Sequence, residues 1–99
     1  MKYTFIGWCH KDEHDKVWGV IELFHNVHTG CNKYVTVWGR RGKKLQTKIS
    51  EEYSWDIDKI IQQKKNKGYI TIDQSKLDQV YPEFERDLSK TAVWSIFKL

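Results

Sequence analysis

Cysteine and proline are both scarce in this chain, and each scarcity excludes a class of protein. Two cysteines are too few for a disulfide scaffold, so reduced thiols are expected, with a Cys9–Cys31 bridge as the alternative. One proline and six glycines leave no low-complexity tract and no linker. The 99 residues fit one domain, but not a barrel or a doubly wound sheet, which need upwards of about 200 residues.

Long apolar runs are also missing. No stretch approaches the roughly 20 consecutive apolar residues that a membrane-spanning helix requires. The apolar segment at the start of the chain is short, is followed by His10 and Lys11, and has no small-residue cleavage site, which is typical of a strand and not of a signal peptide. We therefore expect no membrane association and a cytoplasmic protein, nucleoid-associated if bacterial and nuclear if eukaryotic.

The chain does have local positive charge and many aromatic side chains. The net charge is +4, but the segment from Lys33 to Lys67 holds ten basic and four acidic residues and carries +6. Concentrated positive charge attracts polyanions, of which nucleic acid is the commonest large one, although it also serves to keep a surface solvated. Five tryptophans exceed the needs of a small core, which makes some of them candidates for a binding surface.

Alternation of side-chain types predicts an antiparallel sheet. Four segments have the aromatic and β-branched composition of strands: residues 2–9, 17–24, 33–40 and 45–49. The charged run at residues 10–16 is expected to be a loop, and Gly42 supplies the turn after the third strand. Because the connections are short, the strands should form a meander without crossovers.

The hydrophobic period then changes to that of a helix. Apolar residues from Tyr53 to Ile61 recur at the spacing of one helix face, with Ser50 as the expected N-cap and Gly68 after the end. Residues 68–72 are expected to form a short extended segment, and residues 73–80 a brief helix. Pro82 is expected to begin another helix. Residues 92–99 fit either a strand or a helix.

These elements predict one α+β fold. We expect a small antiparallel β-sheet of about four or five strands packed by one amphipathic helix, over residues 1–72. Residues 73–99 form a short C-terminal extension packed on the same domain.

The segment from Lys33 to Gly42, KYVTVWGRRG, resembles the WGR domain family. Several features occur in the family's order: a strand that runs into Trp-Gly-Arg, a glycine two residues later, a basic strand, an amphipathic helix and a lysine-rich exit into Gly68-Tyr69. The resemblance covers about residues 2–72. The family is best known as a module of the DNA-dependent poly(ADP-ribose) polymerases and also includes stand-alone bacterial and phage proteins.

The resemblance implies a non-catalytic module that binds duplex DNA at ends or nicks. By position, Trp38 is the residue expected to stack on a terminal sugar or base, Arg40 is its polar partner, and Gly39 keeps the backbone between them accessible. The side chains expected to contact phosphates are Arg40, Arg41, Lys43, Lys44 and Lys48, with Lys64, Lys65 and Lys67 as second-tier candidates.

The chain departs from the family pattern in three places. Lys43-Lys44-Leu45 occupies a region where the family usually has a second glycine. The loop at residues 25–32 is rich in histidine and has no transferable role, and residues from Asp73 onward lie outside the usual module. The polymerases' enzymatic activity is not implied by the module alone.

The same residues favour this function without the family. Trp38 and Arg40 have the same parity on a strand, so they should project from one face about 7 Å apart. An aromatic ring beside a guanidinium suits an exposed sugar or base next to a phosphate. The alternative is that Trp38 belongs to the core, where we place the other four tryptophans, and that the lysines only solvate the surface.

Metal-dependent and hydrolytic functions are not favoured. His25, His28 and Cys31 have ligand-like spacing, but Cys9 is expected at the opposite end of the sheet and cannot complete a tetrahedral site with them. The acidic run at residues 12–15 has no nucleophile opposite it, and no catalytic motif occurs.

We therefore predict no enzyme activity, no cofactor and no metal. Nucleic-acid binding, with duplex DNA favoured, is the leading hypothesis. The alternative is a protein-interaction adaptor that presents the same basic and aromatic face to an acidic partner.

Overall fold

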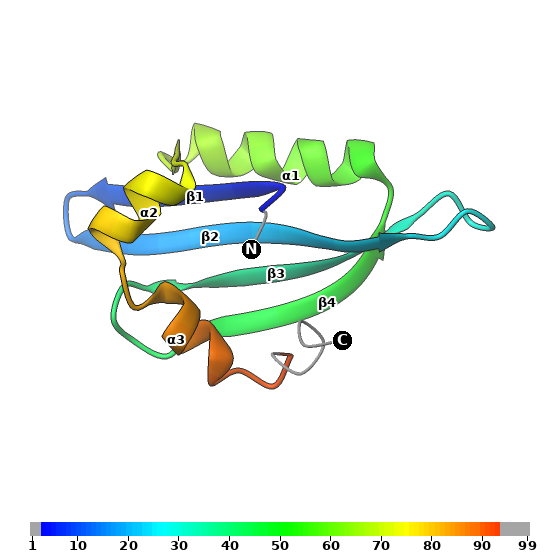
Figure 1. The fold of residues 1–99 in the computed structure, drawn as a ribbon. Helices are drawn as coiled ribbons and strands as arrows, with labels where there is room; N and C mark the ends of the chain where they lie inside the picture. The colour runs from blue at the N-terminus through cyan, green and yellow to red at the C-terminus, as the bar shows by residue number, and fades with distance from the viewer. Residues whose placement is uncertain (1–2, 94–99) are drawn as a thin grey trace.

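The computed structural model describes residues 3–93. The five strands within these residues form one antiparallel sheet. The strands are β1 Phe5–Lys11, β2 His14–His25, β3 Asn32–Arg40, β4 Gln46–Glu52 and β5 Ile70–Thr71. Their order in space is β4-β3-β2-β1-β5, so that the first four strands form the predicted meander and β5 is added beside β1 (Figure 1). With three helices, this sheet confirms the small α+β fold predicted from the sequence.

Helices cover both faces of the sheet. They are α1 Ser54–Asn66, α2 Gln74–Val80 and α3 Phe84–Ser89. The core on the α1 face contains buried residues of strands and helix: Phe5, Cys9, Trp18, Val20, Tyr34, Ile57, Ile61 and Tyr69. The core on the other face joins the sheet to α2 and α3: Ile6, Val17, Ile21, Val37, Leu45, Ile72, Leu77, Tyr81, Phe84 and Leu88. Since strand residues alternate between faces, each long strand contributes to both cores.

The hairpin between β1 and β2 is tighter than predicted. The prediction of a loop over residues 10–16 is wrong. Strand pairing continues to Lys11 opposite His14 and leaves only Asp12 and Glu13 in the turn. Asp12 adopts a φ of 57°, a conformation that aspartate tolerates better than most residues. Backbone hydrogen bonds extend this ladder beyond the core, and polar side chains do not interrupt it.

β4 is longer than predicted, and α1 begins later. The expected N-cap at Ser50 is wrong, because Ser50 pairs with Tyr34 and β4 continues to Glu52, opposite Asn32. The N-cap is Tyr53, which makes no side-chain capping hydrogen bond. At the other end the prediction is confirmed, since basic residues occupy the last turn and Gly68 follows with a φ of 107°.

The described part of the C-terminal extension, residues 73–93, contains two short helices. The Asp73 carboxylate accepts a hydrogen bond from the backbone N–H of Lys76 at 2.7 Å, which caps α2 and confirms the brief helix predicted at residues 73–80. The next helix begins at Phe84 and not at Pro82. Most of the ambiguous segment at residues 92–99 lies outside the described residues, including Trp94. Within residues 3–93, no helix is long and apolar enough to cross a membrane.

Among the tryptophans within residues 3–93, one differs from its predicted place. Trp18 is buried and Trp8 half-buried, but Trp55 is 57% exposed, so its assignment to the core is wrong. It lies two residues before Ile57, about 200° around the helix, and therefore points away from the sheet. Its ring stacks on Tyr53 with centroids 4.4 Å apart.

Candidate nucleic-acid interface

A groove of about 620 Å³ lies on the α1 face, at the end of the sheet where β3 turns into β4. Six of the ten predicted binding residues line it: Trp38, Gly39, Arg40, Lys43, Lys44 and Lys64. The other lining residues were not predicted from the sequence: Lys16, Trp18, Thr36, Gln46 and Tyr69. We call this set the basic groove, because five of its side chains are basic and none is acidic.

Strand register brings these residues together. Trp38 on β3 lies opposite Trp18 on β2 and Gln46 on β4, and Arg40 lies opposite Lys16. Directly paired residues share a face of the sheet, so the two tryptophans and the two cations form adjacent rows. Lys16 and Trp18 have the same parity on β2, which indicates that they share a face of the sheet. That this face also carries Trp38 and Arg40 depends on the pairing register between β2 and β3, which the sequence of β2 alone does not give.

Trp38 contributes to both the core and the groove. It is half-buried and packs against the cluster that contains Trp18 and Tyr34, while it also lines the groove wall. The alternative that Trp38 is a core residue therefore describes only part of its environment. A partly open indole held by packing is a rigid surface for stacking, because little side-chain entropy remains to be lost on binding.

Lys64 reaches the groove from the last turn of α1. Its ammonium lies 5.5 Å from the centroid of the Trp18 ring, an arrangement that favours the cation. Burial lowers the pKa of Lys64, and the positive charges of Lys67 and Lys16 lower it further. Cations held this close repel one another, so an anion that enters the groove relieves the repulsion.

Arg40 and Arg41 lie on opposite faces of the sheet. The Arg40 guanidinium lines the groove and donates to the backbone carbonyl of Glu13 at 3.1 Å. Arg41 does not line the groove. Its guanidinium forms an ion pair with Asp15 at 2.8 Å, donates to the Val80 carbonyl at 2.6 Å and lies 5.7 Å from the Trp8 ring centroid.

The pKa of Asp15 reflects this contact. Burial alone would raise it, but hydrogen bonds from Trp8 and Arg41 bring the pKa of Asp15 below its ordinary value of 3.8. Trp8 Nε1 donates to the same carboxylate at 2.8 Å. Arg41 thus links the sheet to α2, which is a structural role that its place beside Arg40 in the sequence does not reveal.

Three other predicted residues lie outside the groove. Lys48 is exposed and pairs with Thr36, so it extends the positive surface along β4. Lys65, in the last turn of α1, has its ammonium 5.7 Å from the Phe5 ring centroid. Lys67 is exposed at the C-cap of α1, close enough to Lys64 to affect its pKa.

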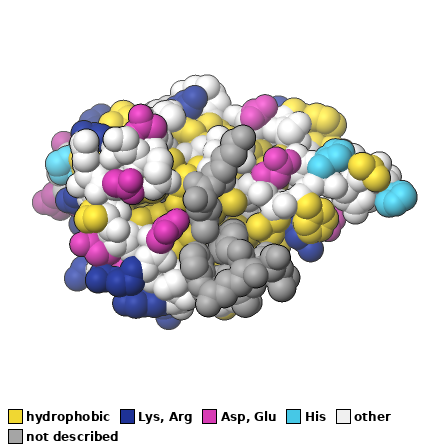
Figure 2. Space-filling model, viewed as in Figure 1, with side chains coloured by type: hydrophobic (Ala, Val, Ile, Leu, Met, Phe, Trp, Pro, Cys, Tyr) yellow, Lys and Arg dark blue, Asp and Glu magenta, His cyan; other side chains and the backbone are white. Residues whose placement is uncertain are grey.

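The histidine-rich loop lies far from the basic groove. Residues 26–31 project from the opposite end of the sheet in Figure 1, and Figure 2 shows histidines at that tip while lysines and arginines gather at the other end. Cys9 pairs with Lys16 near the groove end, and both cysteines are free. Over residues 3–93, no three His, Cys, Asp or Glu side chains come together as a metal site.

Comparisons with known proteins add nothing to this geometry. No family model, curated protein or solved structure matches the chain. The functional interpretation therefore depends on the residues of the groove.

Proposed function

We propose that this protein is a non-catalytic module of the WGR type that binds nucleic acid in the basic groove, with an end or nick of duplex DNA as the favoured ligand. The observation that supports this most is the composition of the groove: five cations, no carboxylate and two tryptophans on one face of the sheet. A protein with this function would lie in the cytoplasm, on the nucleoid if it is bacterial, or in the nucleus if it is eukaryotic.

Each part of the groove has a distinct role in the proposal. The open part of Trp38 stacks on a terminal sugar or an unpaired base, which is accessible only where the duplex is interrupted. Lys16, Arg40 and Lys64 bind the flanking phosphates, and Lys43 and Lys44 extend these contacts from the turn. Phosphate contacts carry no sequence information, so the protein should not select a base sequence.

Binding to blunt, nicked and covalently closed circular duplexes, compared by mobility shift, tests the proposal. Trp38→Ala should weaken binding to the first two by about tenfold, in line with the roughly 1–3 kcal/mol that one stacked base contributes, and should affect circular duplex less. Trp55→Ala is the matched control, because Trp55 is exposed on α1 outside the groove.

Two results would contradict the proposal at different levels. Equal losses on all three duplexes would remove end recognition but leave non-specific DNA binding. No shift of any nucleic acid at low salt would exclude nucleic-acid binding and favour the adaptor that meets an acidic protein.

A further inference from the structure

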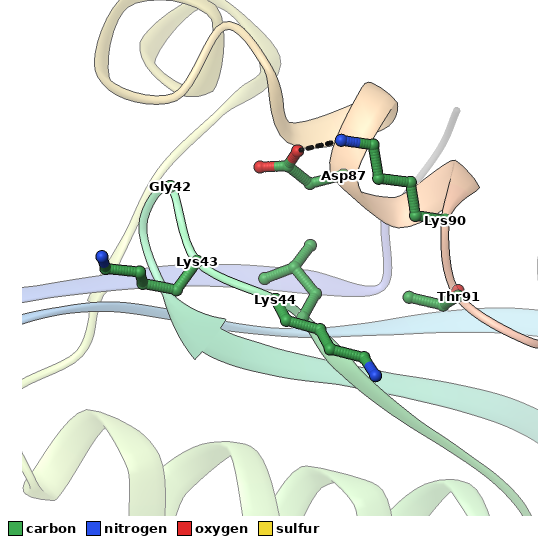
Figure 3. Close-up of a pocket in the computed structure, with 7 residues that line it drawn as sticks. Gly42, Lys43, Lys44, Asp87, Lys90 and Thr91 are labelled. Atoms are coloured by element: carbon green, nitrogen blue, oxygen red, sulfur yellow. Dashed lines mark ion pairs between the residues drawn. The ribbon is translucent and has the colours of Figure 1, made fainter.

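A second basic concavity lies on the other side of the β3–β4 turn. It has a volume of about 380 Å³ and is lined by residues 42–45 of the turn together with Asp87, Lys90 and Thr91 (Figure 3). We call it the turn pocket. Leu45, in its wall, belongs to the core on the α2–α3 face, whereas Trp38 packs against the core on the α1 face. The turn pocket and the basic groove therefore lie on opposite faces.

Lys43 and Lys44 line both concavities. The turn is thus a ridge with a basic hollow on each side. Gly42, at the tip of the ridge, has a φ of 82°, and a Cβ built there would have no heavy atom within 4 Å, so the outer side of the tip is open.

Hydrogen bonds hold the wall of the turn pocket in place. The buried Tyr81 hydroxyl donates to Asp87 Oδ2 at 2.5 Å. Arg41, next to Gly42, donates to the Val80 carbonyl. The turn is therefore held to the end of α2.

The charge of the turn pocket favours an anion. Three lysines line it against a single carboxylate, that of Asp87. This carboxylate is already engaged: one oxygen accepts from Tyr81, and the other lies 3.5 Å from Arg86 Nε. The same oxygen lies 3.9 Å from Lys90 Nζ (Figure 3). Lys90 is largely exposed and therefore free to turn toward a ligand.

We propose that the turn pocket is a second phosphate-binding subsite, which holds a backbone phosphate of the nucleic acid bound in the basic groove. The turn then lies between two phosphates, with Lys43 and Lys44 shared between them and Lys90 contacting only the second. This inference depends on the proposed function, because it assigns a further part of the same ligand.

The variant Lys90→Gln tests the subsite through the salt dependence of blunt-duplex binding. Each phosphate contact that is lost should reduce the slope of log K against log salt by about 0.9, so we expect that change and a several-fold weaker affinity at low salt. Lys76→Gln is the matched control, with the same charge change on α2 and no place in either lining. Lys90→Arg should keep the slope.

A slope in Lys90→Gln equal to that of Lys76→Gln would overturn the inference. Titration with inorganic phosphate, followed by backbone amide NMR shifts, distinguishes the source of the phosphate. Shifts at Gly42 and Thr91 that Lys90→Gln abolishes, combined with an unchanged DNA slope, would mean that the pocket binds free phosphate and not the DNA backbone. If the wild-type protein binds no nucleic acid, the proposed function fails, and the phosphate titration still decides whether the pocket binds phosphate.

Discussion

At the scale of single residues, Arg40 and Arg41 show how neighbours in sequence serve different parts of a sheet protein. Arg40 projects to the α1 face and lines the basic groove. Arg41 projects to the other face, where Asp15 and the Val80 carbonyl satisfy its guanidinium. One position along a strand changes the face, and so it changes the function that a basic side chain can have.

Exchanging each arginine for glutamine should separate these roles. Arg41→Gln should lower the free energy of unfolding by about 1 kcal/mol, a value discounted for the partial exposure of the pair, and leave affinity for blunt duplex within about twofold. Arg40→Gln should weaken DNA binding and change stability little. Urea denaturation and mobility shift measure the two effects. A folded Arg41→Gln variant that loses as much affinity as Arg40→Gln would place Arg41 in the interface.

Tyr3 offers a second prediction at this scale. Its hydroxyl is buried and has no hydrogen-bond partner among residues 3–93, and burial raises the pKa of Tyr3 above its ordinary value of 10.0. Its ring packs edge-on against Phe84 with centroids 5.9 Å apart. Tyr3→Phe removes the unpaired hydroxyl and keeps the ring, so it should stabilise the protein by about 1 kcal/mol in urea denaturation. A loss of stability would show that the hydroxyl does have a partner.

At the scale of elements, the end of β3 explains why a glycine lies between Trp38 and Arg40. Gly39 has a φ of 155°, and a Cβ built on it would lie 3.2 Å from Leu45 Cδ2 and 3.3 Å from the Lys44 carbonyl oxygen. That Cβ would point toward the face opposite Trp38. The glycine is therefore required by the packing of the β3–β4 turn, in addition to any access that it provides in the groove.

Two alanine substitutions in this turn should differ in cost. Gly42→Ala introduces only the strain of a side chain at positive φ, so it should lower the free energy of unfolding by about 1 kcal/mol. Gly39→Ala adds close contacts to the strain of its φ and should cost about 2–3 kcal/mol. Thermal or urea denaturation of both variants checks the order. Equal costs would mean that the turn relaxes around the new methyl group at residue 39.

At the scale of the whole molecule, the C-terminal extension is part of the core. Leu77, Phe84 and Leu88 pack against the sheet, and the Tyr81–Asp87 hydrogen bond lies within this layer. The Arg41 hydrogen bond to the Val80 carbonyl connects the layer to the β3–β4 turn. Burial of Tyr81, together with its hydrogen bond to Asp87, raises its pKa from 10.0 to about 12. Stability of the whole fold should therefore depend on the protonation of this one hydroxyl.

The sign of the dependence follows from the raised pKa. A folded-state value above the unfolded one means that the Tyr81 contribution is fully present below pH 10 and is lost as pH rises through about 12. Tyr81→Phe lacks both the hydrogen bond to Asp87 and the titrating hydroxyl. The difference in free energy of unfolding between wild type and this variant should therefore become smaller as pH rises from 10 to about 12. Urea denaturation of both proteins as a function of pH measures it. A constant deficit would show that Tyr81 does not titrate with unfolding.

Local patterns predicted most of this fold. Period-two alternation located β1 and β3, a nearly continuous apolar run located β2, and the spacing from Tyr53 to Ile61 located α1, because these patterns reflect which side chains are buried. The errors lie at element ends, as with the missing cap at Ser50, where pairing with Tyr34 outweighed a local capping preference. Trp38, Arg40, Lys43 and Lys44 could be chosen as groove residues because they are close in sequence.

The sequence by itself determined the α+β class, the basic segment and the place of Trp-Gly-Arg at the end of a strand, since each depends on residues near one another in the chain. Only the tertiary structure decided that Lys16, Trp18 and Lys64 join Trp38 in one groove and that Arg41 does not. Strand register and the crossing of α1 over the sheet bring those side chains together, and contacts between distant segments set both. Few cysteines, one proline and the lack of a long apolar run argue against several classes of protein, but the position of each charge in space depends on the fold.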